Sequence, residues 1–168
     1  ETLERQRGAP FDARLGANEN GFGPSPRAVA AMRDAAAEVW KYGDPTNHDL
    51  KAALATHCGV GPENVVVGEG IDALLGLAVR LMVAEGDRVV TSAGGYPTFD
   101  FHVTGFGGTL DRVPYAADRQ DPAALVARAA ETGARMVYLC NPDNPMGGWH
   151  PPEVIEAAVA ALPDDVLL

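Results

Sequence analysis

A glycine-rich turn that follows a run of three valines is the first feature that could bind a ligand. Its letters, GEGIDA at residues 68–73, satisfy G-x-G-x-x-A, which marks a dinucleotide site when an acidic residue ends the next strand. The next predicted strand ends in Thr and Ser, so a dinucleotide is disfavoured. The backbone amides of Gly70, Ile71 and Asp72 would still begin a helix whose positive end favours a phosphate. A simple strand-to-helix turn is the alternative.

Two later loops carry side chains that suit an aromatic, oxygen-bearing ligand. YPTFDFH places Tyr96, Phe99 and Phe101 after a predicted strand, where a ring could stack on a ligand or pack in the core. CNPDNPMGG holds Asn141 and Asn144 between prolines, where a carboxamide could donate to a ligand oxygen or only form a turn. Both loops would lie beyond the carboxyl ends of strands, where ligands bind in α/β sheets.

A third polar loop lies near the start of the chain. LGANENGFGPSP crowds Asn18, Glu19 and Asn20 between glycines and prolines, so these side chains could line a pocket or only form turns. Cys58 and Cys140 have neither metal-ligand spacing nor a disulfide-rich setting. We therefore predict no metal site and two reduced thiols.

The elements that must position these loops alternate between strand and helix, which predicts an α/β fold with a mostly parallel sheet flanked by helices. An irregular N-terminal arm is expected over residues 1–25, followed by a helix from Pro26 that ends before Gly43. We expect one region at 1–45, comprising this arm and helix, and an incomplete ligand-binding domain at 46–168. Strands are expected at 64–68, 88–92, 109–113, 135–140 and 165–168, and helices at 47–58, 71–84, 97–104, 122–132 and 152–161.

Composition excludes several classes of protein. The chain has 168 residues, of which 46% are hydrophobic and 21% charged, so it can bury one core. A net charge of -10 without a basic tract argues against nucleic acid or an anionic membrane as the main partner. No window approaches the roughly 18 apolar residues of a membrane span. A soluble, cytoplasmic protein is expected.

Taken in order, these stretches resemble the fold-type I pyridoxal-phosphate aminotransferases, and most closely the histidinol-phosphate aminotransferase branch. LGANENGFGPSP is similar to that branch's L-x-A-N-E-N-P-x-G-P-S-P. ENVVVGEGIDALL is similar to E-N-V-V-V-G-N-G-S-D-E, YPTFDFH to the P-T-Y/F turn, and CNPDNPMGG to N-P-N-N-P-T-G. The resemblance runs from about Leu15 to the last residue.

The resemblance implies a role for each of these loops in binding pyridoxal 5'-phosphate. The amides of Gly70, Ile71 and Asp72 would bind its phosphate. Phe99 would cover the pyridine ring, and Asn144 would hydrogen-bond the ring oxygen. A homodimer with shared active sites is implied, and the remaining predicted contacts are Tyr42, reaching the partner subunit's phosphate, and Asn18 and Asn20, near the substrate.

Several positions depart from the family pattern. Met146 replaces the threonine of N-P-T-G, and Gly21 replaces a proline. The Schiff-base lysine, the aspartate that pairs with the pyridine nitrogen and the arginine that binds the substrate carboxylate would all lie beyond Leu168. Neither Lys41 nor Lys51 fits the lysine's place, so the chain has no nucleophile for this chemistry. We expect this chain alone to be inactive and poorly soluble.

The predicted function of the longer parent is transamination between an amino donor and a keto acceptor. Histidinol phosphate is the leading substrate, which would place the protein in histidine biosynthesis, and aromatic amino acids are others. A decarboxylase on the same scaffold, such as one acting on a phosphorylated threonine, is the alternative enzyme. A non-catalytic fragment or binding module and a nucleotide-binding or methyl-transferring domain are the alternatives from other classes.

Overall fold

The computed structural model describes residues 2–13 and 19–168, so the predicted substrate residue Asn18 lies outside the described residues. The chain forms two compact units, residues 1–47 and 48–168, and each is described by itself. Among the described residues, no helix combines the length and the hydrophobicity needed to span a membrane.

The first unit contains short helices. They are α1 (Thr2–Arg7), α2 (Pro26–Ala35) and the 3-10 turn η1 (Ala36–Glu38). Ser25 caps α2, because its side chain accepts from the Ala28 amide at 3.1 Å. The irregular arm predicted for residues 1–25 was wrong at α1, which fits into the six residues before Gly8, where φ is +76°. The helix predicted to reach almost to Gly43 ends earlier, because α2 tightens into η1.

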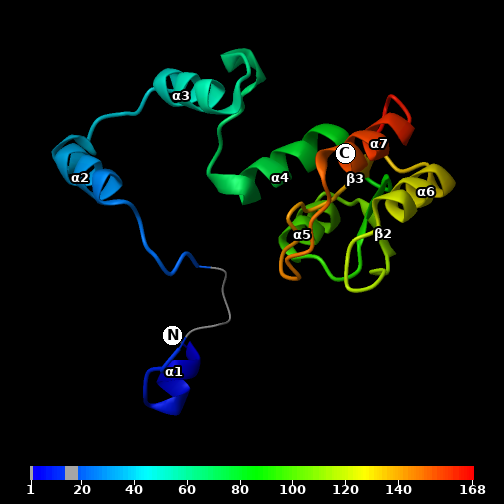
Figure 1. Ribbon diagram of the computed structural model, residues 1–168, viewed down its shortest axis with the longest axis horizontal. Helices are drawn as coiled ribbons and strands as arrows, with labels where there is room; N and C mark the ends of the chain where they lie inside the picture. The colour runs from blue at the N-terminus through cyan, green and yellow to red at the C-terminus, as the bar shows by residue number, and fades with distance from the viewer. Residues whose placement is uncertain (1, 14–18) are drawn as a thin grey trace. The chain divides into compact units, whose positions relative to one another are not determined.

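The second unit is built on a three-stranded parallel sheet (Figure 1). Its strands are β1 (Arg88–Ser92), β2 (Thr109–Val113) and β3 (Met136–Val137), in the order β2-β1-β3. The α/β fold with a parallel sheet flanked by helices is therefore confirmed. The helices are α3 (His48–Cys58), η2 (Pro62–Asn64), α4 (Gly70–Met82), α5 (Thr98–Gly105), α6 (Pro122–Thr132) and α7 (Pro152–Ala161).

The core lies on both faces of β1, because successive side chains of a strand point to opposite faces. Val89 packs with side chains of α4 and α5, including Val79 and Phe99. Val90 packs on the other face with Leu125 and other side chains of α6. This two-sided burial explains why β1 is apolar at consecutive positions rather than at alternating ones.

Three predicted strands differ from the structure. Residues 64–68 form no strand, because this valine run has no neighbouring strand in the described chain. The strand predicted at 135–140 is assigned only at β3, although the Tyr138 amide still donates to the Val90 carbonyl at 2.9 Å. The strand predicted at 165–168 is reduced to one parallel bridge between Met136 and Leu167.

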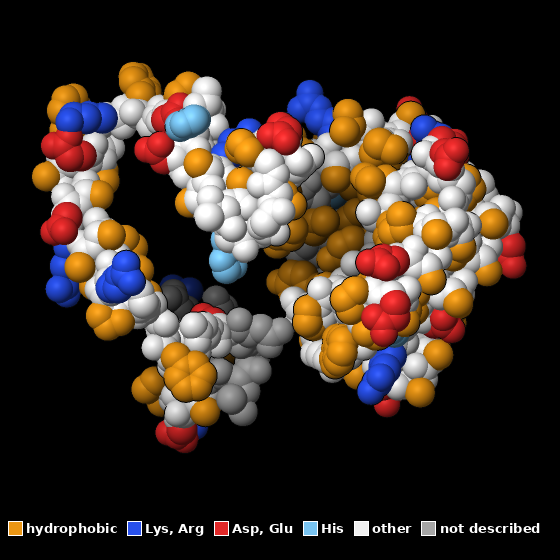
Figure 2. All heavy atoms as spheres, turned by 45° about the horizontal axis from the view of Figure 1, so that its top comes forward, with side chains coloured by type: hydrophobic (Ala, Val, Ile, Leu, Met, Phe, Trp, Pro, Cys, Tyr) orange, Lys and Arg blue, Asp and Glu red, His pale blue; other side chains and the backbone are white. Residues whose placement is uncertain are grey.

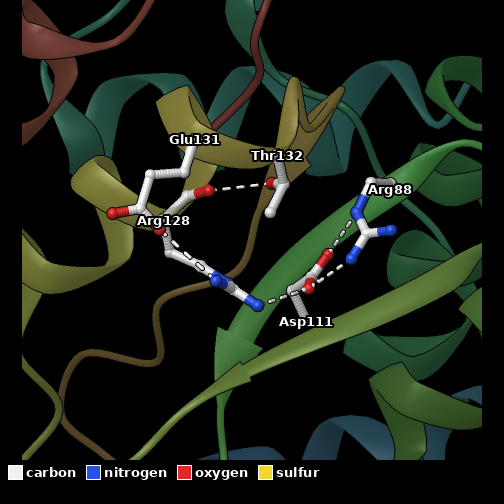
Figure 3. Close-up of polar contacts among 5 residues, drawn as sticks. All are labelled: Arg88, Asp111, Arg128, Glu131 and Thr132. Carbon is white, nitrogen blue, oxygen red and sulfur yellow. Dashed lines mark hydrogen bonds and ion pairs between the residues drawn. The ribbon is translucent and has the colours of Figure 1, made fainter.

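A buried carboxylate ties β2 to its neighbours (Figure 3). Asp111 is 5% exposed and accepts from Arg88 of β1 at 2.5 and 2.7 Å and from Arg128 of α6 at 3.1 Å. The hydrogen bond from Arg88 is the largest cause that lowers the pKa of Asp111 below its usual value, and burial opposes it. This cluster fixes α6 and β1 against the middle of β2.

Helix α4 is apolar on more than its buried face. Val79 is fully buried, whereas Ile71, Leu77 and Leu81 are largely exposed. Figure 2 shows that hydrophobic side chains are widespread on the visible surface. Because an amphipathic helix normally exposes polar side chains, α4 presents apolar area that the described residues leave uncovered.

Candidate functional site

The loops after β1 and β3 meet at the carboxyl edge of the sheet. The chain passes from β1 to β2 on one side and then crosses to β3 on the other, so the strand order reverses between β1 and β3. Ligands of open α/β sheets bind at such a reversal. The two loops are joined there by the Tyr96 amide, which donates to the Asn144 carbonyl at 3.0 Å. Asn144 therefore lies beside the loop after β1, at the carboxyl edge of the sheet.

The loop that carries Asn144 is closed by its own side chains. The Asn141 carboxamide accepts from the His150 amide at 2.8 Å and donates to the His150 carbonyl at 3.0 Å. His150 Nε2 lies 2.9 Å from the Gln120 carbonyl. Asn141 therefore closes the base of the loop.

A buried polar cluster beneath this loop was missed by the sequence reasoning. Asp143 is 6% exposed and accepts from the Tyr115 hydroxyl at 2.7 Å and from Gln120 Nε2 at 2.5 Å. Burial is the main cause that raises the pKa of Tyr115, followed by its hydrogen bond to Asp143, so the hydroxyl stays protonated and donates at neutral pH. The sequence signal that could have indicated this cluster is the acidic residue Asp143 between two prolines of the loop.

Phe99 is part of the core. Its side chain is 1% exposed, and its ring stacks on Tyr138 with centroids 4.2 Å apart and planes 18° from parallel. Burial raises the pKa of Tyr138 to about 12, so that ring is also neutral. A ligand ring can lie on Phe99 only if Tyr138 or the neighbouring loop moves, and the flat open face expected from sequence is not present here.

Helix α4 begins at an open glycine with a left-handed backbone. Gly70 adopts φ +80°, and no heavy atom lies within 4 Å of the place where a Cβ would be. Its amide donates to the Gly68 carbonyl at 2.8 Å, so Ile71 and Asp72 are the better placed donors of the three predicted amides. The Asp72 carboxylate lies 2.7 Å from His102 Nε2 of α5, which links the two helices.

The other predicted site residues belong to the first unit. Tyr42 is fully exposed. The Asn20 side chain accepts from the Phe22 amide at 3.1 Å and lies 3.4 Å from the Gly23 carbonyl, so within this unit it forms a turn.

Comparison with known proteins assigns this arrangement to a family. The model of the class I and II aminotransferases matches residues 13–167. The chain belongs to this family. Among curated relatives, the histidinol-phosphate aminotransferase of Anaeromyxobacter sp. (strain Fw109-5) is 36% identical over the whole chain, and that of Moorella thermoacetica is 33% identical. The chain spans 46% and 43% of these two proteins, about half the length of each.

Solved structures of the same family agree with this fold. The histidinol-phosphate aminotransferase from Sinorhizobium meliloti, solved in complex with pyridoxal-5'-phosphate, matches with a TM-score of 0.96 at 56% identity. The match covers 99% of this chain and 45% of that one. A second aminotransferase structure, from Erwinia carotovora atroseptica, matches with a TM-score of 0.84 at 28% identity. The family resemblance inferred from the sequence motifs is therefore confirmed.

Proposed function

We propose that these 168 residues belong to a longer pyridoxal-phosphate-dependent aminotransferase that acts on histidinol phosphate and a keto acid partner. The observation that carries this proposal is the 56% identity to a histidinol-phosphate aminotransferase whose structure contains pyridoxal-5'-phosphate. The cofactor supplies an electron sink for amino-group transfer, and the protein supplies binding, orientation and electrostatics. The relatives are about twice as long, so we assign the activity to the longer parent.

The residues present fit the cofactor at its phosphate end. The open space at Gly70 lets an anion approach the backbone, where a Cβ would intrude. Glu69, at the N-cap of α4, makes no side-chain capping bond, so the first amides of the helix are left to an anion. In our proposal Ile71 and Asp72 bind the phosphate through their amides, and His102 holds the Asp72 carboxylate toward α5.

At the ring end we assign Asn144 to the cofactor's ring oxygen. Its loop is held against the loop after β1 by the Tyr96 amide, which fixes the backbone of Asn144 at the strand reversal. Phe99 would cover the pyridine ring of the cofactor once the Tyr138 side chain, which now stacks on Phe99, has moved aside. Asn18 and Asn20 remain proposed substrate contacts.

We further propose a cytoplasmic homodimer in which Tyr42 reaches the phosphate site of the partner subunit. The exposure of Tyr42 and the apolar surface left open on α4 suit a chain that is covered by further polypeptide. Both cysteines are free thiols, which suits a reducing compartment.

Borohydride reduction of the full-length parent with pyridoxal phosphate, followed by peptide mapping, tests the cofactor assignment. We expect a single adduct on a lysine outside residues 1–168. Absence of an adduct, or scattered labelling of Lys41 and Lys51, would contradict it.

Incubation with histidinol phosphate and a keto acid should then yield amino-group exchange without release of carbon dioxide, whereas carbon dioxide release would identify a decarboxylase.

Gly70→Ala in the full-length parent should weaken pyridoxal-phosphate binding about tenfold, because the left-handed backbone costs an alanine about 1–2 kcal/mol and the turn must rearrange. Gly133→Ala is a matched control, since Gly133 also has a positive φ, +65°, and no neighbouring atom within 4 Å, but it ends α6. Both variants should lose similar stability, and only Gly70→Ala should lose cofactor affinity in a fluorescence titration. Equal affinities would remove Gly70 from the phosphate site.

A further inference from the structure

The buried cluster around Asp143 is more elaborate than a proline-fixed turn requires. The Asp143 carboxylate accepts from two side chains that both follow β2, Tyr115 and Gln120. Its backbone is fixed as well: the amide donates to the Gly148 carbonyl at 2.7 Å, and the carbonyl accepts from the Gly147 amide at 2.9 Å. The residue is therefore held by bonds from its side chain and its main chain together.

Gln120 connects the same loop at further points. Its Nε2 lies 3.4 Å from the Cys140 carbonyl, and its Oε1 lies 3.4 Å from the Cys140 amide. Its main-chain carbonyl lies 2.9 Å from His150 Nε2. Both ends of the loop and its buried carboxylate are thus attached to the segment after β2.

The residue that follows Asp143 is Asn144, whose carbonyl accepts from the Tyr96 amide of the loop after β1. The backbone of Asn144 is consequently held from two directions, by the Asp143 cluster on one side and by the loop after β1 on the other. A carboxylate suits the centre of the Asp143 cluster, because it only accepts hydrogen bonds and can accept from both the Tyr115 hydroxyl and Gln120 Nε2. Removing it would leave the partly buried Tyr115 hydroxyl without its acceptor and Gln120 Nε2 with only the longer contact to the Cys140 carbonyl.

We propose that Asp143 is a positioning residue that orients Asn144 toward the bound cofactor. The inference rests on the proposed function, since it assumes that Asn144 contacts pyridoxal phosphate. Asp143 itself does not touch the cofactor and acts only through its neighbour in the chain. Tyr115 and Gln120 act one step further out, as the donors that fix the carboxylate.

The test is a double-mutant cycle in the full-length parent, with Asp143→Ala and Asn144→Ala made singly and together. The two readouts are the pyridoxal-phosphate dissociation constant and the pH midpoint of the bound cofactor's absorbance change. We expect Asp143→Ala to weaken binding about tenfold and to move the midpoint in the same direction as Asn144→Ala. In the Asn144→Ala background, Asp143→Ala should have little further effect on either readout.

Tyr115→Phe is the milder second variant, because it removes one hydroxyl donor and leaves the carboxylate in place. It should shift both readouts in the same direction by a smaller amount. Asp118→Asn is the control for loss of one negative charge in the same connection, since Asp118 is exposed and asparagine tolerates its positive φ of 60°. Asp118→Asn should change neither readout.

If Asp143→Ala changes the two readouts as much in the Asn144→Ala background as in the wild type, the positioning role is overturned and Asp143 is a general structural residue. An unchanged midpoint in both Asp143→Ala and Tyr115→Phe would also overturn it. If Asn144→Ala changes neither readout although the wild type binds the cofactor, the assignment of Asn144 fails, and this inference fails with it. If the wild type does not bind pyridoxal phosphate, the proposed function fails as well.

Discussion

Phe99→Ala is expected to lower the free energy of unfolding by about 3–5 kcal/mol, the usual cost of removing a buried phenylalanine ring. Phe99 is 1% exposed and packs in the cluster that joins α4 and α5 to β1, with Val79, Val89 and Val103 as buried neighbours. Its removal would also leave one face of Tyr138 uncovered. Urea denaturation of the full-length parent and its variant would measure the difference.

Phe101→Ala is the matched control for this prediction, because Phe101 lies on the same helix with its side chain 69% exposed. Its cost should stay within about 0.5 kcal/mol, as for most surface substitutions. A third variant, Phe99→Leu, keeps much of the apolar volume and removes the aromatic face. If Phe99→Ala costs no more than Phe101→Ala, Phe99 is not the core residue described above.

Asp111→Asn is expected to cost about 2–3 kcal/mol. Breaking a buried ion pair from one side usually costs about 3–5 kcal/mol, and the figure is reduced here because both arginine partners are partly exposed and can hydrate. Asp165→Asn is the control: Asp165 pairs with Arg135 at 2.6 Å, but the carboxylate is 70% exposed. That surface pair should contribute no more than about 1 kcal/mol.

The contribution of Asp111 depends on pH in a direction set by its lowered pKa. A carboxylate whose pKa is lower in the folded state stabilises the protein above its unfolded pKa, about 3.9, and loses that contribution as pH falls through the folded value. The difference in unfolding free energy between wild type and Asp111→Asn should therefore be constant from about pH 5 to 8 and shrink below about pH 4. A difference that grew on acidification would contradict the ion-pair interpretation.

The elements from residue 88 to 161 were largely predictable from the sequence, because their patterns are local. Asp121 and Pro122 begin α6 as expected, with the Asp121 side chain accepting from the Ala123 and Ala124 amides, and Gly133 ends it. The valine run at 64–68 was not predictable in the same way. Three valines favour extended backbone, but a strand also needs a neighbour, and sequence spacing does not reveal that no strand of the described chain pairs with this run.

The candidate site was predictable in location but not in detail. The rule that ligands bind beyond strand ends pointed to the loops that carry Tyr96 and Asn144, and the structure joins these two loops by a hydrogen bond. The loop position of Asp143 was a visible signal, but its partners were not predictable, because Tyr115 lies 28 residues away in the sequence and the contact depends on the strand order. The burial of Phe99 also depends on tertiary packing, since an aromatic residue near a ligand edge fits either role.

The order of strands in the sheet has a consequence for the newly made chain. β1 is the central strand, yet both of its partners come later, and about 45 residues separate the end of β1 from the end of β3. At roughly 5–20 residues per second, a ribosome needs about 2–9 seconds to supply that stretch. During this interval Val89 and Val90 lack their final cover, so the nascent chain should be a better chaperone client than the finished domain.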